Sequence, residues 1–316
     1  MIGVIGRRRW RVHSNQHKMG RWIDNDMVSG PDMGGVEMGS PELKPVARRP
    51  SILQSPIQLS KDIINHRFLA IALVKRNLRT RYRTAGLGYT WMVLEPTLLA
   101  LTYYFLFIMI AGNPDRLYPI WVLIGVIVWS TFGKSFTGSV TALTSNTQLI
   151  HTSYFPRIIL PFSITLGHVV VGLGSSLVLI PAIAALHTPI TPHLLWIPIG
   201  IAMAGMMGGA LGTMFAPLNC KIRDVEHLTR FIVRAGFFFS PVMWTAEMAL
   251  ERGTFGHIAL WNPMVTPITL VRHAVDGHAL ELPLPIVSSS ICFLLVMSVV
   301  GGMVFSSSEH QAVKHL

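Results

Sequence analysis

Six long apolar stretches constrain the fold of this chain more than any other feature. They cover residues 91–111, 119–139, 158–186, 194–217, 229–245 and 284–305. A helix needs about 20 mainly apolar residues to cross the hydrocarbon core of a bilayer. The fifth stretch is the shortest, and Lys134 weakens the second. The sequence therefore predicts an all-α integral membrane protein with six transmembrane helices.

The composition agrees with a membrane protein. Charged residues make up 13% of the chain and the mean hydropathy is +0.49, whereas an average soluble domain has about 25% charged residues. These values exclude a disordered chain and argue against a soluble enzyme. The net charge of +11 is typical either of a nucleic-acid-binding protein or of a membrane protein with cationic cytoplasmic ends.

The placement of the basic residues decides between these two classes. In a six-span arrangement, every Lys and Arg except Arg116, Arg252 and Arg272 falls on the side that holds both termini. The positive-inside rule assigns that side to the cytoplasm. We therefore expect both termini to be cytoplasmic, with no nucleic-acid partner.

The chain divides into three predicted regions. Residues 1–55 are basic, lack apolar periodicity and are expected to be a disordered cytoplasmic tail. Residues 56–88 are predicted to contain an amphipathic interfacial helix, because helical spacing relates its apolar side chains: Ile64, Phe68, Ile71, Leu78 and Tyr82. Residues 89–316 are the six-span domain. Within it, 246–275 is too polar to span and is predicted to form short re-entrant or interfacial helices.

Several charged residues lie close to the first span. Arg76, Arg79, Arg81 and Arg83 make the end of the interfacial helix strongly basic. Such an Arg cluster suits the phosphate of a lipid through charge-assisted hydrogen bonds. Glu95 stands directly before Pro96, which is typical of a helix start. Glu95 either caps this helix or pairs with an Arg near the cytoplasmic end.

Two predicted cytoplasmic loops carry motifs that can each be interpreted in two ways. The segment Tyr154-Phe155-Pro156-Arg157 offers aromatic side chains beside a proline turn, either for a partner's groove or for anchoring in the membrane. The basic residues of the segment 221–224 favour the cytoplasmic side of the membrane. Its Asp224 interrupts the positive charge and suggests an ion pair with a neighbouring Arg.

Helix-breaking and helix-packing residues mark the later spans. Pro241 is expected to kink or end the fifth span after the three phenylalanines 237–239, which cannot share one helical face. The fourth span has glycines four residues apart, the spacing for close helix packing, within the subunit or between subunits: Gly205, Gly208, Gly209 and Gly212. We expect His168 to be a packing residue rather than a proton relay.

The order of these motifs over about residues 60–316 resembles the permease subunit of ABC exporters of polysaccharides. The segments 79–82, 87–91 and 94–96 resemble capsule-exporting permeases. Tyr154–Arg157 with Leu160-Pro161, Arg223-Asp224, Ser240-Pro241 and Asn262-Pro263 resemble O-antigen and teichoic-acid permeases. The long basic tail departs from this family.

The resemblance implies a homodimer in the bacterial inner membrane that moves a lipid-linked glycan. Two copies of a separate ABC subunit would hydrolyse ATP, and these would hold the ATP and Mg. This chain itself would bind no cofactor and would not be an enzyme.

The resemblance also implies roles for individual residues. The ATPase-coupling contacts would be Tyr154, Phe155, Pro156, Arg157, Arg223 and Asp224. The gate, in the outward helices of 246–275 and the adjoining turn, would include Ser240, Pro241, Trp261, Asn262 and Pro263. The lipid phosphate would be met by Arg76, Arg79, Arg81 and Arg83, beside Glu95. Aromatic rings facing passing sugars would come from Tyr103, Tyr104, Phe107 and Phe238.

Two other functions fit parts of the sequence. An ABC exporter of drugs or small lipids shares the fold and needs no continuous aromatic path. An intramembrane glycosyl- or acyl-transferase would need an acid/base set at membrane depth, where only Glu95 and His168 lie and nothing pairs them. A proton-coupled carrier would need more buried carboxylates.

Overall fold

A computed structural model describes residues 55–83, 85–111, 117–185, 192–277 and 282–314. These residues form helices joined by short connections, and none of them lies in a β-strand. The helices are α1 Ser55–Asn65, α2 Arg67–Tyr82, α3 Trp91–Ala111, α4 Tyr118–Val140, α5 Thr147–Thr152, α6 Ile159–Ser176, α7 Leu179–Ala185, α8 Trp196–Lys221, α9 Asp224–Phe239, α10 Ala246–Leu250, α11 Thr254–Leu260, α12 Val265–Asp276 and α13 Leu284–Val313. The predicted all-α class is confirmed. The predicted tail lies outside the described residues except for Ser55.

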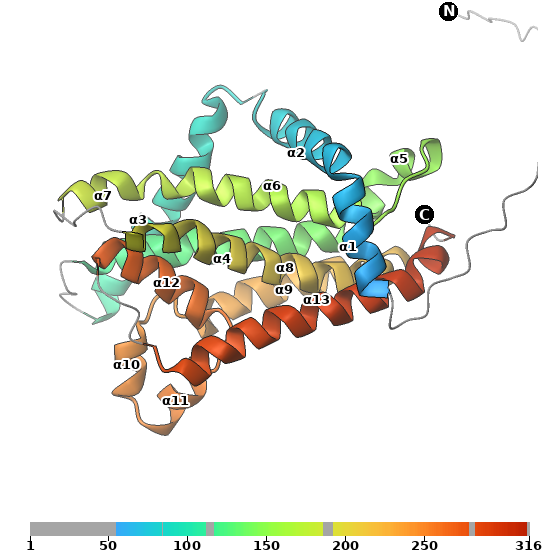
Figure 1. The fold of residues 1–316 in the computed structure, drawn as a ribbon. Coiled ribbons are helices and arrows are strands. Elements are labelled where there is room, and N and C mark those ends of the chain that lie inside the picture. Colours follow the sequence, from blue (N-terminus) through green and yellow to red (C-terminus); the bar gives the residue numbers. More distant parts are fainter. Residues whose placement is uncertain (1–54, 84, 112–116, 186–191, 278–281, 315–316) are drawn as a thin grey trace, which may run out of the picture. The chain divides into compact units, whose positions relative to one another are not determined.

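Four described stretches are long and apolar enough to cross a bilayer: Tyr118–Val140, Ile159–Pro181, Pro192–Lys221 and Leu284–Glu309. The helix α4 lies at the centre, packed against α6 and α8, and α8 also packs along α13. Figure 1 shows these four helices running alongside one another. The helices α3, with 21 residues, and α9, with 16, occupy the first and fifth predicted ranges, and their crossing of the membrane stays a prediction.

The glycines of α8 allow this close packing within one chain. A Cβ atom on Gly208 would collide with the carbonyl oxygen of Phe132 in α4, and one on Gly212 would lie 2.6 Å from that of Phe136. On Gly205 and Gly209 it would collide with side chains of α6. The four-residue spacing predicted from the sequence therefore serves contacts of α8 with α4 and α6.

The apolar core has separate clusters toward the two ends of the helices. One cluster joins α2, the turn after α4, α5, the start of α6, the end of α8 and the last part of α13. The main cluster reaches the other end, where the starts of α4 and α8 meet α12. Figure 1 shows α5 and α10–α11 at opposite ends of the long helices.

Two predicted spans differ from the observed helices because of prolines. The range 158–186 is not one helix, since α6 stops before Leu177 and α7 begins at Leu179. Pro181 explains the break, because it lacks the N–H that would bond to the carbonyl of Leu177 and its ring clashes there. The range 229–245 was also wrong at both ends. The helix α9 ends at Phe239, because Ser240 is extended before Pro241.

The placement of Pro96 in the first turn of a helix was wrong. The helix α3 already begins at Trp91 and continues past Pro96. A proline inside a helix leaves the carbonyl four residues earlier without its donor. Here the hydroxyl of Ser175 in α6 donates to the carbonyl of Met92 at 2.6 Å. This bond explains how α3 tolerates the proline.

The predicted interfacial helix is two helices, α1 and α2, divided at His66. Ala70, Leu73, Val74 and Tyr82 are the buried side chains of α2, and α2 packs on α6 whereas α1 packs on α13. Three side chains of the predicted apolar face, Ile64, Phe68 and Ile71, are exposed, and their contact with the membrane interface stays a prediction. The sequence pattern did not reveal that α1 packs mainly on α13, with a smaller contact to α6, and α2 on α6.

Candidate functional site

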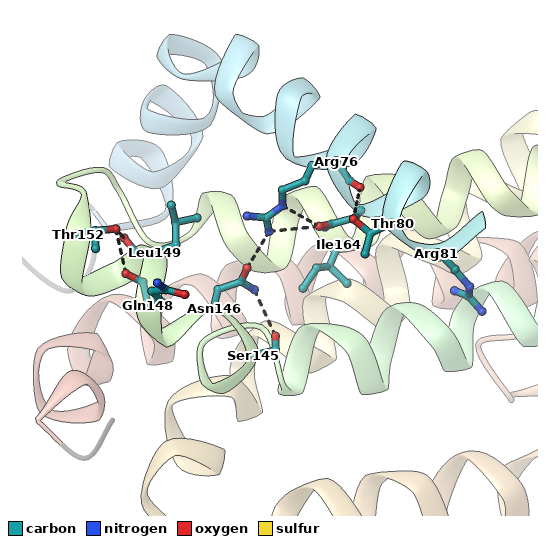
Figure 2. Close-up of a pocket in the computed structure, with 10 residues that line it drawn as sticks. Arg76, Thr80, Arg81, Ser145, Asn146, Gln148, Leu149, Thr152 and Ile164 are labelled. Atoms are coloured by element: carbon teal, nitrogen blue, oxygen red, sulfur yellow. Dashed lines mark hydrogen bonds between the residues drawn. The ribbon is translucent and has the colours of Figure 1, made fainter. Parts of the chain in front are cut away.

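A polar groove of ≈ 670 Å³ lies between α2 and the connection from α4 to α6. Arg76 anchors it, because its Nη2 donates to Asn146 Oδ1 at 2.8 Å and to Asn77 Oδ1 at 3.2 Å. Figure 2 shows Arg76 above Asn146, and Arg81 at the end of the groove opposite Thr152. The groove thus brings together two of the four arginines predicted to meet a lipid phosphate.

The other two predicted arginines lie elsewhere. Arg79 and Arg83 are exposed on α2 and after it, and neither lines the groove. The guanidinium of Arg81 lies 5.7 Å from the centre of the Tyr82 ring. Burial raises the pKa of Tyr82, against the opposing charge of Arg81, so Tyr82 remains neutral.

Glu95 has a lysine partner rather than the predicted arginine. Its Oε1 accepts a hydrogen bond from Lys134 Nζ at 2.8 Å, joining α3 to α4. Lys134 looked like a weak point of the second span, yet the ion pair supplies its counter-charge. His168 of α6 lies beside the pair, and its Nδ1 is buried without a hydrogen-bond partner.

Both loops predicted to contact the ATPase lie at the α5 end of the helices. Tyr154 is fully exposed between α5 and α6, whereas Phe155 packs against the core cluster there. Cys220, next to the second loop, belongs to the same cluster. Asp224 begins α9 and joins neither of the described ion pairs.

The sequence missed the residue that orders the second loop. Asn219, at the end of α8, is buried, and its Oδ1 accepts the backbone N–H of Glu226 at 3.1 Å. The same N–H also bonds to the carbonyl of Arg223 at 3.2 Å, so Asn219 adds a second acceptor in the first turn of α9. An Asn shortly before a new helix is a capping signal, but here it lies inside the preceding helix.

The residues predicted to form the gate meet at the opposite end. Asn262 Nδ2 donates to Phe239 O at 3.1 Å and to Ser240 Oγ at 3.3 Å. Its Oδ1 accepts the backbone N–H of Met264 at 2.9 Å. The two motifs Ser240-Pro241 and Asn262-Pro263 are therefore parts of one hydrogen-bonded turn. Trp261 is exposed beside it.

A buried arginine that the sequence did not single out joins this turn to the bundle. Arg272 of α12 is 6% exposed. Its guanidinium donates to the carbonyls of Trp244 at 3.0 Å, Val242 at 3.1 Å and Trp121 at 3.2 Å. Arg272 therefore holds α12, the turn after α9 and the start of α4 together.

The predicted aromatic residues do not share one surface. Tyr103 packs on Phe237, with ring centres 4.6 Å apart, and Tyr104 also packs against the core. Phe238 is 65% exposed, although its ring meets that of Phe237 edge-on with centres 5.4 Å apart. The side chain of Phe107 lies outside the described set. A role of these rings toward sugars stays a prediction.

Comparison with known proteins gives a consistent family assignment. Residues 69–275 match the family model described as ABC-2 type transporter. The chain is 28% identical over 225 residues to the O-antigen export system permease protein RfbA of Myxococcus xanthus, covering 71% of this chain and 86% of that protein. It is 27% identical over 250 residues to RfbA of Klebsiella pneumoniae, covering 77% and 93%. It is 26% identical over 208 residues to the polysialic acid transport protein KpsM of Escherichia coli, covering 65% and 80%.

Proposed function

The chain belongs to the ABC-2 type transporter family, and we propose that it is the membrane-spanning permease subunit of a polysaccharide exporter. The observation that carries this proposal is the similarity to O-antigen and polysialic acid exporters over most of their length. The matched range 69–275 includes the groove, both loops at the α5 end and the turn at Asn262. The family assignment also favours a transporter over the alternative of an intramembrane transferase.

We further infer the arrangement in the membrane. Six spans, formed by α3, α4, α6–α7, α8, α9 and α13, place both termini in the cytoplasm of a bacterium, with the protein in the inner membrane. The α5 end then faces the cytoplasm and the turn at Asn262 faces outward. The uneven distribution of Lys and Arg supports this orientation.

ATP hydrolysis belongs to a separate subunit in this proposal. Two copies of this chain would assemble with two ATP-binding subunits, which hold the ATP and Mg. Tyr154 and the segment Arg223-Asp224 would contact the ATPase from the α5 end. The full exposure of Tyr154 beside a packed Phe155 supports a docking role.

Substitution of Tyr154 tests this coupling. We expect Tyr154→Ala to lower glycan export and transport-linked ATP hydrolysis about tenfold, the loss typical of a buried aromatic anchor at an interface. The measurement is ATPase activity of the reconstituted complex with and without lipid-linked glycan. Phe255→Ala, which removes an aromatic ring 85% exposed at the other end, is the matched control. Equal activity of both variants would rule out the coupling role.

The substrate would be a glycan linked to a lipid through phosphate, received in the groove at Arg76 and Arg81. Arg binds phosphate with two parallel charge-assisted hydrogen bonds. The groove is lined on one side by α2, and the exposed Phe68 and Ile71 of α2 and Ile64 of α1 are suited to contact lipid. This position allows a phosphate to be bound while its lipid chain remains in the bilayer.

Paired arginine substitutions test the groove. We expect Arg76→Gln/Arg81→Gln to reduce export about tenfold or more, because each hydrogen bond to a charged group contributes about 1.5–3 kcal/mol. The variant Arg79→Gln/Arg83→Gln removes the same charge from α2 and its end but leaves the groove intact. It is expected to export nearly normally. Surface glycan in complemented deletion cells is the measurement, and equal losses in both variants would contradict a specific site.

A further inference from the structure

Three neighbouring cavities share lining residues, and the first two are open to the surface. The groove shares Arg81 with a second cavity of ≈ 300 Å³, called here the inner cavity, whose polar lining includes Lys134, Thr137, His168, Glu226 and Arg230. The inner cavity in turn shares Lys134 and His168 with a narrow pocket at Glu95. The cationic side chains Arg76, Arg81 and Lys134 therefore line successive cavities.

The charges around the inner cavity leave one positive charge uncompensated. Its three cations are Arg81, Lys134 and Arg230. Arg230 Nη1 pairs with Glu226 at 2.8 Å and Lys134 pairs with Glu95 at 2.8 Å. Within the described part of the chain, no carboxylate pairs with Arg81. The cavity thus matches an anion with a single charge, such as a phosphodiester or a phosphate monoester monoanion.

The Lys134–Glu95 ion pair is open enough to be exchanged. The two side chains are 28% and 40% exposed, so neither is enclosed by protein, and partly exposed ion pairs contribute less to stability than buried ones. Lys134 stands at the boundary of both spaces, so its ammonium can face Glu95 in the narrow pocket or an anion in the inner cavity. A lysine ammonium is a compact charge on a flexible stem and suits such a change of partner.

His168 provides an unused polar group at the same position. Its Nδ1 is buried without a hydrogen-bond partner, although buried polar atoms usually have one. A Cβ atom on Gly138, which lines the inner cavity, would lie 3.5 Å from this nitrogen. A Cβ atom there would also lie 2.8 Å from the Ile164 side chain and 2.9 Å from Cε1 of His168, so the His168 ring packs directly on Gly138. A ligand oxygen therefore reaches Nδ1 only when this ring turns toward the inner cavity.

We propose that the inner cavity is a second binding site for the phosphate of the lipid-linked substrate, in which Lys134 exchanges Glu95 for the phosphate. The proposal rests on the proposed function. The phosphate first binds Arg76 and Arg81 in the groove, and then moves past Arg81 to Lys134 and His168. When it leaves, Lys134 returns to Glu95. Glu95 therefore competes with the phosphate for one lysine.

This competition predicts opposite effects of removing the two partners. The full chain is placed in phosphatidylcholine nanodiscs with a polyprenyl monophosphate, and the bound lipid is measured by native mass spectrometry. Lys134→Met should weaken binding at least about tenfold, the loss expected for one charge-assisted hydrogen bond. Glu95→Gln should strengthen binding about threefold, because a partly exposed ion pair no longer competes. The double variant Glu95→Gln/Lys134→Met removes both charges of the ion pair and should bind as weakly as Lys134→Met.

Further variants and lipids distinguish this site from a structural ion pair and from a site for soluble anions. Lys75→Met removes an exposed lysine of α2 outside both cavities and should bind like the wild type.

A purely structural ion pair would make Glu95→Gln and Lys134→Met weaken binding alike, which would overturn the proposal. A wild-type chain that prefers the monophosphate to the polyprenyl alcohol, with no effect of Lys134→Met, would overturn this site but leave the proposed function standing. If the wild-type chain binds the monophosphate and the alcohol equally, it does not recognise the lipid phosphate, and the proposed function is contradicted as well. Equal binding of inorganic phosphate alone would assign the cavity to a soluble anion and contradict the proposal.

Discussion

Gly208→Ala is expected to disrupt the packing of α8 against α4. The added methyl group would collide with the backbone carbonyl of Phe132 and would lie 3.1 Å from the backbone nitrogen of Phe136. Backbone atoms of a central helix cannot move aside as a flexible side chain can. Overpacking of a core costs about 1–3 kcal/mol, and we expect the upper end of this range.

Thermal unfolding of the purified chain in detergent measures this effect. A loss of about 3 kcal/mol corresponds to a fall in Tm of about 5 °C for a protein of this size. Gly167→Ala is the matched control, because Gly167 lies in the neighbouring helix α6 and a Cβ atom there would contact nothing within 4 Å. Its Tm should be unchanged or slightly higher, since alanine favours helices. A Gly208→Ala chain as stable as this control would disprove the close contact.

Arg272→Met is expected to release the turn after α9 from the bundle. The carbonyls of Val242 and Trp244 lie outside helices and would lose their donor. The carbonyl of Trp121 lies within α4 and keeps a helical partner. Two unsatisfied buried carbonyls cost about 1–3 kcal/mol each, partly offset because no charge is then buried. We expect the free energy of unfolding to fall by about 2 kcal/mol and the turn after α9 to lose its fixed conformation.

Hydrogen exchange localises this change. Amides of residues 240–246 should exchange at least tenfold faster in Arg272→Met, as expected for about 1.4 kcal/mol or more of lost local stability. Export should fall in parallel. Arg252→Met removes an exposed arginine between α10 and α11 and should change neither measurement. Unchanged protection of the turn would show that Arg272 does not hold it.

Apolar length predicted the positions of α3 and α4 closely, because a long run of apolar residues in lipid has few alternatives to a helix. Helix ends set by single side chains were harder to predict. Ser175 supports Pro96 from another helix, and Asn219 caps α9 from inside α8. The sequence pattern also gave no sign that Gly253, with φ +61, separates α10 from α11.

The sequence predicted which types of residue form the candidate site, but it did not predict which residues contact one another. The cluster of arginines before the first span pointed to the groove, but only the folded chain distinguishes Arg76 and Arg81 from Arg79 and Arg83. Lys134 and Arg272 are single charges within apolar stretches, and their partners lie 39 and 28 to 151 residues away. Such long-range pairs carry no local sequence signal.

The measurement that tests the central claim most directly is the location of the lipid-linked glycan in cells that lack this chain. Deletion should leave the glycan attached to its lipid on the cytoplasmic side of the inner membrane and remove it from the cell surface. The wild-type chain should restore surface glycan only when its separate ATP-binding subunit is present. Normal surface glycan in the deletion strain, or restoration without any ATP-binding subunit, would contradict a permease role in polysaccharide export.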